Sequence, residues 1–173
     1  QDLIHKGSLS GRNPVPEGHY AEETMKTTIV PNRNMIMLSI AVGYAGKINA
    51  GKVFYGAHKG DSMYPDCYKQ FVLALDTAVY LGNLWENDNK SIRIEAPFID
   101  MTKTDIVKRG LELKVTFQNT WSCYKANDRP CSTNLCGTCF ERIEAFYKNN
   151  TPDPLLTKEE WEEGVKYILK YGK

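Results

Sequence analysis

Hydrophobic and polar residues follow one another along this chain with the periods of helices separated by short strands. The first thirty residues show no sustained period and are expected to be irregular. Long apolar runs, or hydrophobic residues recurring every three or four positions, predict helices at residues 35–48, 68–81, 102–113, 139–148 and 157–171. Short segments rich in β-branched and aromatic residues predict strands at 52–57 and 92–96 and an extended piece at 115–117.

Individual side chains indicate where helices begin and which face each one buries. Asn34 stands where it could cap the helix at 35–48, and Thr157 with Glu160 forms a capping box for the last helix. The buried face expected on the helix at 68–81 comprises Phe71, Leu75, Ala78, Val79 and Gly82, although Gly82 could instead end that helix. The buried stripe of the last helix comprises Trp161, Val165, Ile168 and Leu169.

The alternation of helices and strands predicts an α/β domain with a mostly parallel sheet. Parallel sheets are covered on both faces and rarely have so few strands, so we expect an incomplete sheet. We interpret residues 1–173 as a single, partial domain. Within it, residues 1–120 form the α/β core, and residues 121–173 form a segment of clustered cysteines and the last helices.

Composition and charge are those of an ordinary globular protein. Of the 173 residues, 42% are hydrophobic and 25% are charged, which suits one packed domain and excludes the disordered classes. The 22 basic and 21 acidic residues nearly balance, so the sequence predicts no nucleic-acid partner. No apolar run reaches the roughly 18 residues of a membrane span, and the start QDLIHKG shows no export signal. We therefore expect a cytoplasmic protein with no membrane partner.

Four of the five cysteines lie within seventeen residues, in the segment WSCYKANDRPCSTNLCGTCFER. Cys136 and Cys139 form a C-x-x-C knuckle, and Cys123 and Cys131 complete the four thiolates that a tetrahedral Zn²⁺ prefers. Two disulfides or four unrelated buried thiols are the alternatives, and such clustering in a chain without an export signal is more typical of a metal site than of disulfides. We predict one structural zinc ion, with Cys67 outside its ligand set.

Two polar segments are candidates for a ligand pocket. In VPNRN, Arg33 and Asn34 stand at a helix start that could bind an anion, although local evidence alone favours a simple cap beside a surface arginine. The segment GAHKGDSMYPDC follows a predicted strand, where ligand sites of open α/β sheets lie, and its chemically active residues are His58, Asp61, Tyr64, Asp66 and Cys67. A polar loop whose Tyr64 packs on the core is the alternative. No histidine partner is evident for Cys67, so we interpret it as a buried or pocket-lining thiol.

Taken together, VPNRN before an apolar helix, then YPDC, WSCY and CGTCFER, resemble the 7-cyano-7-deazaguanine synthases of the queuosine pathway. The resemblance runs from about Ser8 to Phe146, and the order and spacing of the four motifs make it specific. It implies a Rossmann-like fold of the adenine nucleotide alpha-hydrolase type with a C-terminal zinc-binding helical segment. It also implies an ATP-dependent ligase that converts 7-carboxy-7-deazaguanine and ammonia to 7-cyano-7-deazaguanine, with ATP and Mg²⁺ as co-substrate. By the same resemblance the zinc ligands are Cys123, Cys131, Cys136 and Cys139, and the substrate pocket contains Arg33, Asn34, Asp61, Tyr64 and Asp66.

The sequence departs from this family in two places. The family grips ATP with a glycine-rich SGGxDS-type loop after its first strand, whereas residues 8–12 read SLSGR, so we expect that loop and the first strand–helix units to be missing. The 173 residues by themselves should then neither bind ATP tightly nor form AMP. Cys131 and Cys136 also stand two residues further apart than is usual, which should bulge the loop without losing a ligand.

Two other functions stay open on the sequence alone. A related ligase could act on another substrate, such as a protein terminus in a defence system, but VPNRN and YPDC favour the deazaguanine. A zinc-stabilised RNA-binding module is the second alternative, and the near-neutral charge speaks against it. A homodimer is a further expectation.

Overall fold

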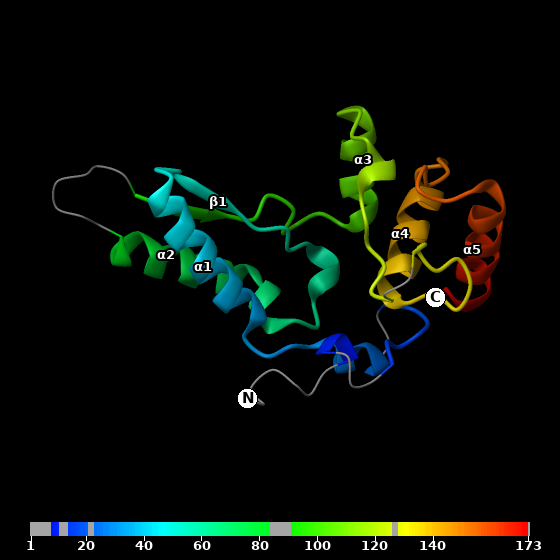
Figure 1. The fold of residues 1–173 in the computed structure, drawn as a ribbon, viewed down its shortest axis with the longest axis horizontal. Helices are drawn as coiled ribbons and strands as arrows, with labels where there is room; N and C mark the ends of the chain where they lie inside the picture. The colour runs from blue at the N-terminus through cyan, green and yellow to red at the C-terminus, as the bar shows by residue number, and fades with distance from the viewer. Residues whose placement is uncertain (1–7, 11–13, 21–22, 84–90, 126–127, 173) are drawn as a thin grey trace. The chain divides into compact units, whose positions relative to one another are not determined.

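A computed structural model describes residues 8–10, 14–20, 23–83, 91–125 and 128–172. Its longer elements are α1 (Arg33–Lys47), β1 (Lys52–Phe54), α2 (Lys69–Gly82), β2 (Arg93–Glu95), α3 (Lys103–Glu112), α4 (Gly137–Lys148) and α5 (Lys158–Tyr171) (Figure 1). Short 3₁₀ helices lie at η1 (Ser8–Ser10), η2 (Glu23–Thr28), η3 (Lys59–Asp61), η4 (Pro65–Cys67) and η5 (Phe117–Asn119). The mixed α/β class with a small parallel sheet is confirmed.

The chain forms two compact units. The first unit combines Gln1–Val30 with Lys103–Lys173, and the second unit is Pro31–Thr102. The division expected at residue 120 falls inside the first unit and stays a prediction.

In the described part of the second unit, the strands β1 and β2 pack with the helices α1 and α2. The strands pair in parallel, with Val53 opposite Ile94, and Figure 1 shows α1 and α2 beneath them. The core of this unit consists of Leu38, Val42 and Ala45 from α1, Val72 and Val79 from α2, and Ile92 and Ile94 from the second strand segment. Asp76 ties α2 to β2, because its carboxylate accepts hydrogen bonds from the Arg93 guanidinium and from the Ile94 amide, the latter at 2.8 Å.

In the first unit, α4 packs against both α3 and α5 and lies between them in Figure 1. Its side chains Phe140, Ile143 and Phe146 are each at most 1% exposed, so α4 is the central helix of this unit. Thr157 and Glu160 form the predicted capping box at the start of α5. Among the described residues, no helix is long and apolar enough to cross a membrane.

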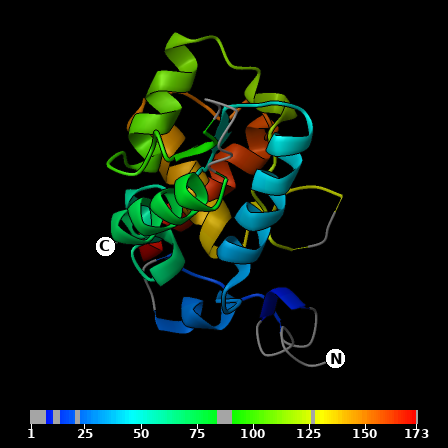
Figure 2. The same ribbon diagram turned by 90° about the vertical axis from the view of Figure 1, so that its left-hand side faces the viewer.

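The five predicted helices and both predicted strands are confirmed, with ends that differ by a few residues, but the predicted cap of α1 is wrong. Figure 2 shows α1 in cyan as one regular helix. The residue before it is Asn32, in a left-handed conformation with φ 59° and no side-chain cap. Asn34 lies inside the helix, where its side chain donates a hydrogen bond to the Cys67 sulfur at 3.3 Å.

Three further local expectations are wrong. The buried face of α2 is centred on Val72, Asp76 and Val79, whereas Ala78 and Gly82 are exposed, because the helix turns its polar Asp76 toward β2. Leu169 is 63% exposed, and Gly164 takes its place in the contact between α5 and α4. The extended piece expected at 115–117 is not a strand, and Phe117 instead begins the 3₁₀ helix η5.

Candidate metal centre and substrate site

The four clustered cysteines come together in the first unit. Cys123 and Cys131 lie in the loop before α4, Cys136 immediately precedes that helix, and Cys139 lies in its first turn. All four Sγ atoms lie within 4.8 Å of one another. Three of the residues are buried and Cys131 is half-buried, so the cluster is shielded from water.

The spacing of the sulfur atoms fits a tetrahedral metal ion. The Sγ atom of Cys131 lies 3.7 Å from that of Cys136 and 3.8 Å from that of Cys123, and the Cys136–Cys123 distance is 4.0 Å. Four thiolates at about 2.3 Å from a zinc ion stand about 3.8 Å apart. These distances exclude disulfides, whose sulfur atoms are about 2.05 Å apart, and all four cysteines are free.

The electrostatics of the cluster also call for a cation. Hydrogen bonds from the Cys131 and Cys139 thiols hold the pKa of Cys136 far below its usual value. Hydrogen bonds with Cys131 and Cys136, together with burial, raise the pKa of Cys139. One thiolate is thus stabilised at the expense of its neighbours, and a divalent cation is what allows several buried thiols to ionise together. The cluster therefore has the donors, the spacing and the burial of a closed Zn²⁺ site.

Backbone pairing fixes the loop that carries these ligands. Gly18 donates a hydrogen bond to the Leu135 carbonyl at 2.9 Å, and an isolated bridge joins Glu17 to Cys136. Lys125 contacts both Glu17 and the Asn134 carbonyl. An open hollow of about 460 Å³ lies along the outer side of the loop, and its cations Lys125 and Arg129 are already paired with Glu17 and Glu160.

In the second unit, three of the five predicted substrate residues come together at the carboxyl end of β1. The Asp66 carboxylate accepts a hydrogen bond from the Asn34 backbone amide at 3.1 Å. Arg33 Nε donates to the Asn34 side-chain oxygen at 3.4 Å. The Asn34 amide group in turn reaches Cys67, so that the start of α1 and the YPDC turn are joined by a polar cluster.

The other two predicted residues, Asp61 and Tyr64, lie in the turns that lead to this cluster. The Asp61 carboxylate accepts a hydrogen bond from the His58 amide at 3.0 Å, and the His58 ring accepts one from Gly60. Backbone hydrogen bonds then run from Tyr64 to Asp61 and from Cys67 to Tyr64. The Asp61 carboxylate thus stabilises its own loop.

Cys67 has the properties of a structural thiol. It is buried, and burial raises its pKa to about 11. Tyr55 lies 3.1 Å from its sulfur and donates a hydrogen bond to the Asp66 carbonyl at 3.0 Å. A thiol that stays protonated near neutral pH is a poor nucleophile. The interpretation of Cys67 as a buried thiol therefore agrees with its surroundings.

Sequence reasoning missed Tyr55 and the pair Arg142–Asp153. Tyr55 directly follows β1, at the strand end where α/β folds place ligands, and that position was the available signal. Arg142 and Asp153 are buried together in the first unit, at the back of the cysteine loop. A single arginine in a helix and a single aspartate in a loop give no local signal of such a pair.

Comparison with known proteins gives a consistent result. The model of the family described as "Queuosine biosynthesis protein QueC" matches residues 1–150. A 7-cyano-7-deazaguanine synthase of Archaeoglobus fulgidus is 57% identical over 166 residues, which cover 95% of this chain and 67% of that protein. A protein of the same name from Caldicellulosiruptor bescii is 53% identical over 82% of this chain and 61% of its own length. One from Methanoregula boonei is 51% identical over 89% of this chain and 68% of its own. The chain thus spans about two thirds of the length of these relatives.

Proposed function

Since this chain belongs to the QueC family of queuosine biosynthesis proteins, we propose that it serves the ATP-dependent conversion of 7-carboxy-7-deazaguanine and ammonia to 7-cyano-7-deazaguanine. The observation that carries the proposal is the 57% identity over 166 residues to a 7-cyano-7-deazaguanine synthase. The chain contains all four motifs of the resemblance, VPNRN, YPDC, WSCY and CGTCFER.

The proposed reaction activates a poor electrophile twice. A carboxylate oxygen attacks the α-phosphorus of ATP, which releases pyrophosphate and leaves an acyl adenylate. Ammonia attacks the acyl carbon, AMP leaves, and a proton is lost to give the amide. The amide oxygen then attacks the α-phosphorus of a second ATP and releases pyrophosphate, and loss of AMP and of the two amide protons gives the nitrile. Mg²⁺ accompanies ATP as its counter-ion.

We assign the substrate to the carboxyl end of β1. Parallel strands present ligands at that end, and Arg33, Asn34 and Asp66 are gathered there. A guanidinium suits the carboxylate or a phosphate of the reactants, and a carboxylate suits the N–H edge of the guanine-like base. Asp61 and Tyr64 belong to the same proposal as residues of the adjoining turns.

We also propose a Rossmann-like fold of the adenine nucleotide alpha-hydrolase type and one structural Zn²⁺ on the four cysteines. The metal would tie the loop at residues 123–139 to α4, with no part in bond making. Absence of a nucleic-acid partner, a cytoplasmic location and a homodimer stay predictions, of which the near-neutral charge supports the first.

The proposed activity is tested with a chimeric protein that combines this chain with the remainder of the Archaeoglobus fulgidus synthase. The 166 matched residues of the Archaeoglobus fulgidus synthase are replaced by the corresponding residues of this chain, and the chimera is incubated with 7-carboxy-7-deazaguanine, ammonium and Mg-ATP. Mass spectrometry should detect the nitrile, and AMP should form with it.

Two controls accompany the chimera. The unmodified relative reports on the assay, and the 173 residues alone should give no AMP, because no glycine-rich phosphate loop is present in them. A folded chimera that forms no nitrile beside an active relative would contradict the proposed function. Turnover by the 173 residues alone would show that the nucleotide site lies within them.

A further inference from the structure

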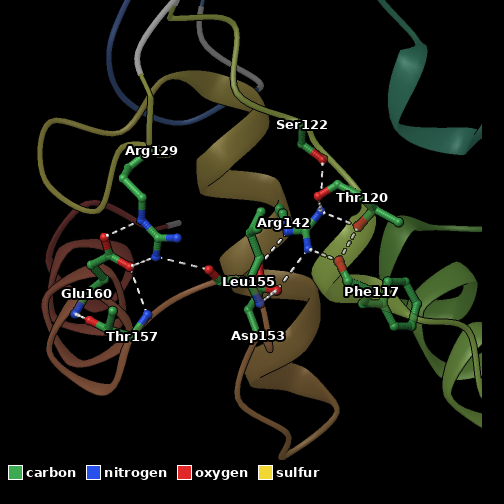
Figure 3. A network of polar contacts seen from close by, with 9 residues as sticks. All are labelled: Phe117, Thr120, Ser122, Arg129, Arg142, Asp153, Leu155, Thr157 and Glu160. Carbon is green, nitrogen blue, oxygen red and sulfur yellow. Dashed lines mark hydrogen bonds and ion pairs between the residues drawn. The ribbon is translucent and has the colours of Figure 1, made fainter.

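Arg142 is buried in α4 against Asp153. The two side chains are 7% and 0% exposed, and the guanidinium binds both carboxylate oxygens, with Nη2 at 2.8 Å from Oδ1 (Figure 3). Asp153 Oδ1 also accepts a hydrogen bond from the Leu155 amide at 3.1 Å. The pair thus holds the turn between α4 and α5 against α4.

The remaining N–H groups of Arg142 bind the segment that leads to Cys123. Nη1 donates to the Thr120 hydroxyl at 2.8 Å, to the Thr120 carbonyl at 3.3 Å and to the Ser122 hydroxyl at 3.4 Å. Nη2 donates to the Phe117 carbonyl at 3.2 Å. Figure 3 shows these groups converging on the guanidinium from the loop side of the helix. One arginine therefore fixes residues 117–122 of the chain to α4.

This arrangement places the anchor close to the metal ligands. Arg142 lies three residues after Cys139 on the same helix, which is about one turn. Cys123 follows directly after the anchored residues, and its carbonyl accepts a further hydrogen bond from the Trp121 ring at 3.0 Å. A buried ion pair contributes little to stability by itself, because desolvation offsets the attraction. The more important effect of the Arg142–Asp153 pair is that it fixes the position of Cys123.

We propose that Arg142 is a positioning residue of the metal centre, which holds Cys123 in place for the ion before the ion binds. The inference rests on the zinc site of the proposed function. Cys123 is the ligand farthest in sequence from the knuckle at 136–139, so an unanchored Cys123 would have to be ordered by the metal itself. When Arg142 has already ordered this segment, metal binding no longer has to supply the free energy of ordering it, and the affinity for zinc is higher.

The neighbouring pair Arg129–Glu160 provides a matched control. Arg129 also belongs to the cysteine loop, and it donates to the Glu160 carboxylate and to the Leu155 carbonyl (Figure 3). Its side chain is 51% exposed, however, and it stands on the water-facing side of the loop. Exposed ion pairs are screened and contribute little, so its loss should scarcely affect the metal.

The experiment compares zinc affinity in the wild-type chain, Arg142→Gln and Arg129→Gln, by competition with a chromophoric chelator. Arg142→Gln should weaken zinc binding about 10- to 100-fold, the usual effect of losing a residue that orients a metal ligand. Arg129→Gln should change it less than about threefold. Cobalt substituted for zinc should show altered thiolate-to-metal absorption in Arg142→Gln alone, a signature that lower stability would not produce.

Thr120→Val is a milder variant for the case in which Arg142→Gln does not fold. It removes one 2.8 Å hydrogen bond of Arg142 and should weaken zinc binding about threefold to tenfold. Wild-type affinity and an unchanged cobalt spectrum in folded Arg142→Gln, or unchanged affinity in Thr120→Val, would overturn the inference. A wild-type chain that binds no zinc would instead contradict the metal site itself, so the two failures are distinct.

Discussion

Replacing Asp66 should loosen the first turn of α1, because its carboxylate supplies the cap that the helix lacks locally. Asn32 provides no side-chain cap, and Asp66 Oδ2 accepts the Asn34 amide at 3.1 Å. Loss of a capping acceptor costs roughly 0.5–2 kcal/mol, and loss of a negative charge at a helix start roughly 0.3–1 kcal/mol. We therefore expect about 1–2 kcal/mol for Asp66→Ala and about 0.5 kcal/mol for Asp66→Asn, which keeps an acceptor oxygen.

Hydrogen exchange at the start of α1 measures this effect directly. With 1.4 kcal/mol per factor of ten, the amides of Asn34 and Ile36 should exchange about 5- to 30-fold faster in Asp66→Ala and about twofold faster in Asp66→Asn. Asp61→Ala is the control, since Asp61 bonds within its own turn and should leave α1 unchanged. Wild-type exchange in Asp66→Ala, or equal acceleration in Asp61→Ala, would refute the capping role.

The same pair of variants separates capping from substrate recognition. An asparagine side chain offers one acceptor and one donor group, whereas the N–H edge of a guanine-like base needs two acceptors. In the active chimera, Asp66→Asn should thus raise the KM for 7-carboxy-7-deazaguanine severalfold while accelerating the exchange at the start of α1 only about twofold. An unchanged KM would remove Asp66 from the substrate site and leave it as a cap alone.

Three more predictions concern the metal and the acid limit of stability. Cys136→Ser should lose the zinc that the wild-type chain holds, whereas Cys67→Ser should keep it, as counted by metal analysis after gel filtration. Apparent zinc affinity should fall as pH decreases through the acid range, because the ligating thiols must lose protons, and chelator competition at several pH values checks this. A hydrogen bond from Arg93 lowers the pKa of Asp76 in the folded protein. The ionised carboxylate therefore stabilises the fold fully above the unfolded pKa of about 3.9, and this stabilisation is lost as pH falls through the lower folded pKa. In Asp76→Asn, the free energy of unfolding measured in urea should depend less on pH over this acid range.

Features that depend on a few adjacent residues could be predicted from the sequence. The capping box of Thr157 and Glu160 needs only a three-residue spacing, and the structure forms it. The cysteine ligands were likewise predicted from a knuckle and two nearby thiols, and all four sulfur atoms meet within 4.8 Å. In the capping box a three-residue spacing brings the participants together, and in the cysteine segment the shared residue type and the C-x-x-C knuckle identify them.

The burial of individual side chains was harder to predict, because the sequence of the second unit contains more apolar residues than its core buries. The run at 35–48 is almost wholly apolar, yet only one side of α1 faces the core, through Leu38, Val42 and Ala45. Met37, Ile40 and Tyr44 on another side are 60–69% exposed. An apolar sequence therefore indicates that a helix can be buried, but the elements packed against the helix determine which of its sides is buried.

The residues of the polar cluster at the carboxyl end of β1 could be proposed from the sequence, but the contacts between them could not. Arg33, Asn34 and Asp66 were proposed because two short motifs resemble a family, and their substrate role stays a prediction. The hydrogen bond that joins Asn34 to Asp66 spans 32 positions. Nothing local requires an aspartate in YPDC to cap a helix that begins at Arg33; the requirement arises only when α1 packs beside β1 and η4. One carboxylate, that of Asp66, thus caps the start of α1 and is proposed to bind the N–H edge of the substrate base. Asp66→Ala should therefore disturb both the helix start and the proposed substrate contact, whereas Asp66→Asn should disturb chiefly the proposed substrate contact.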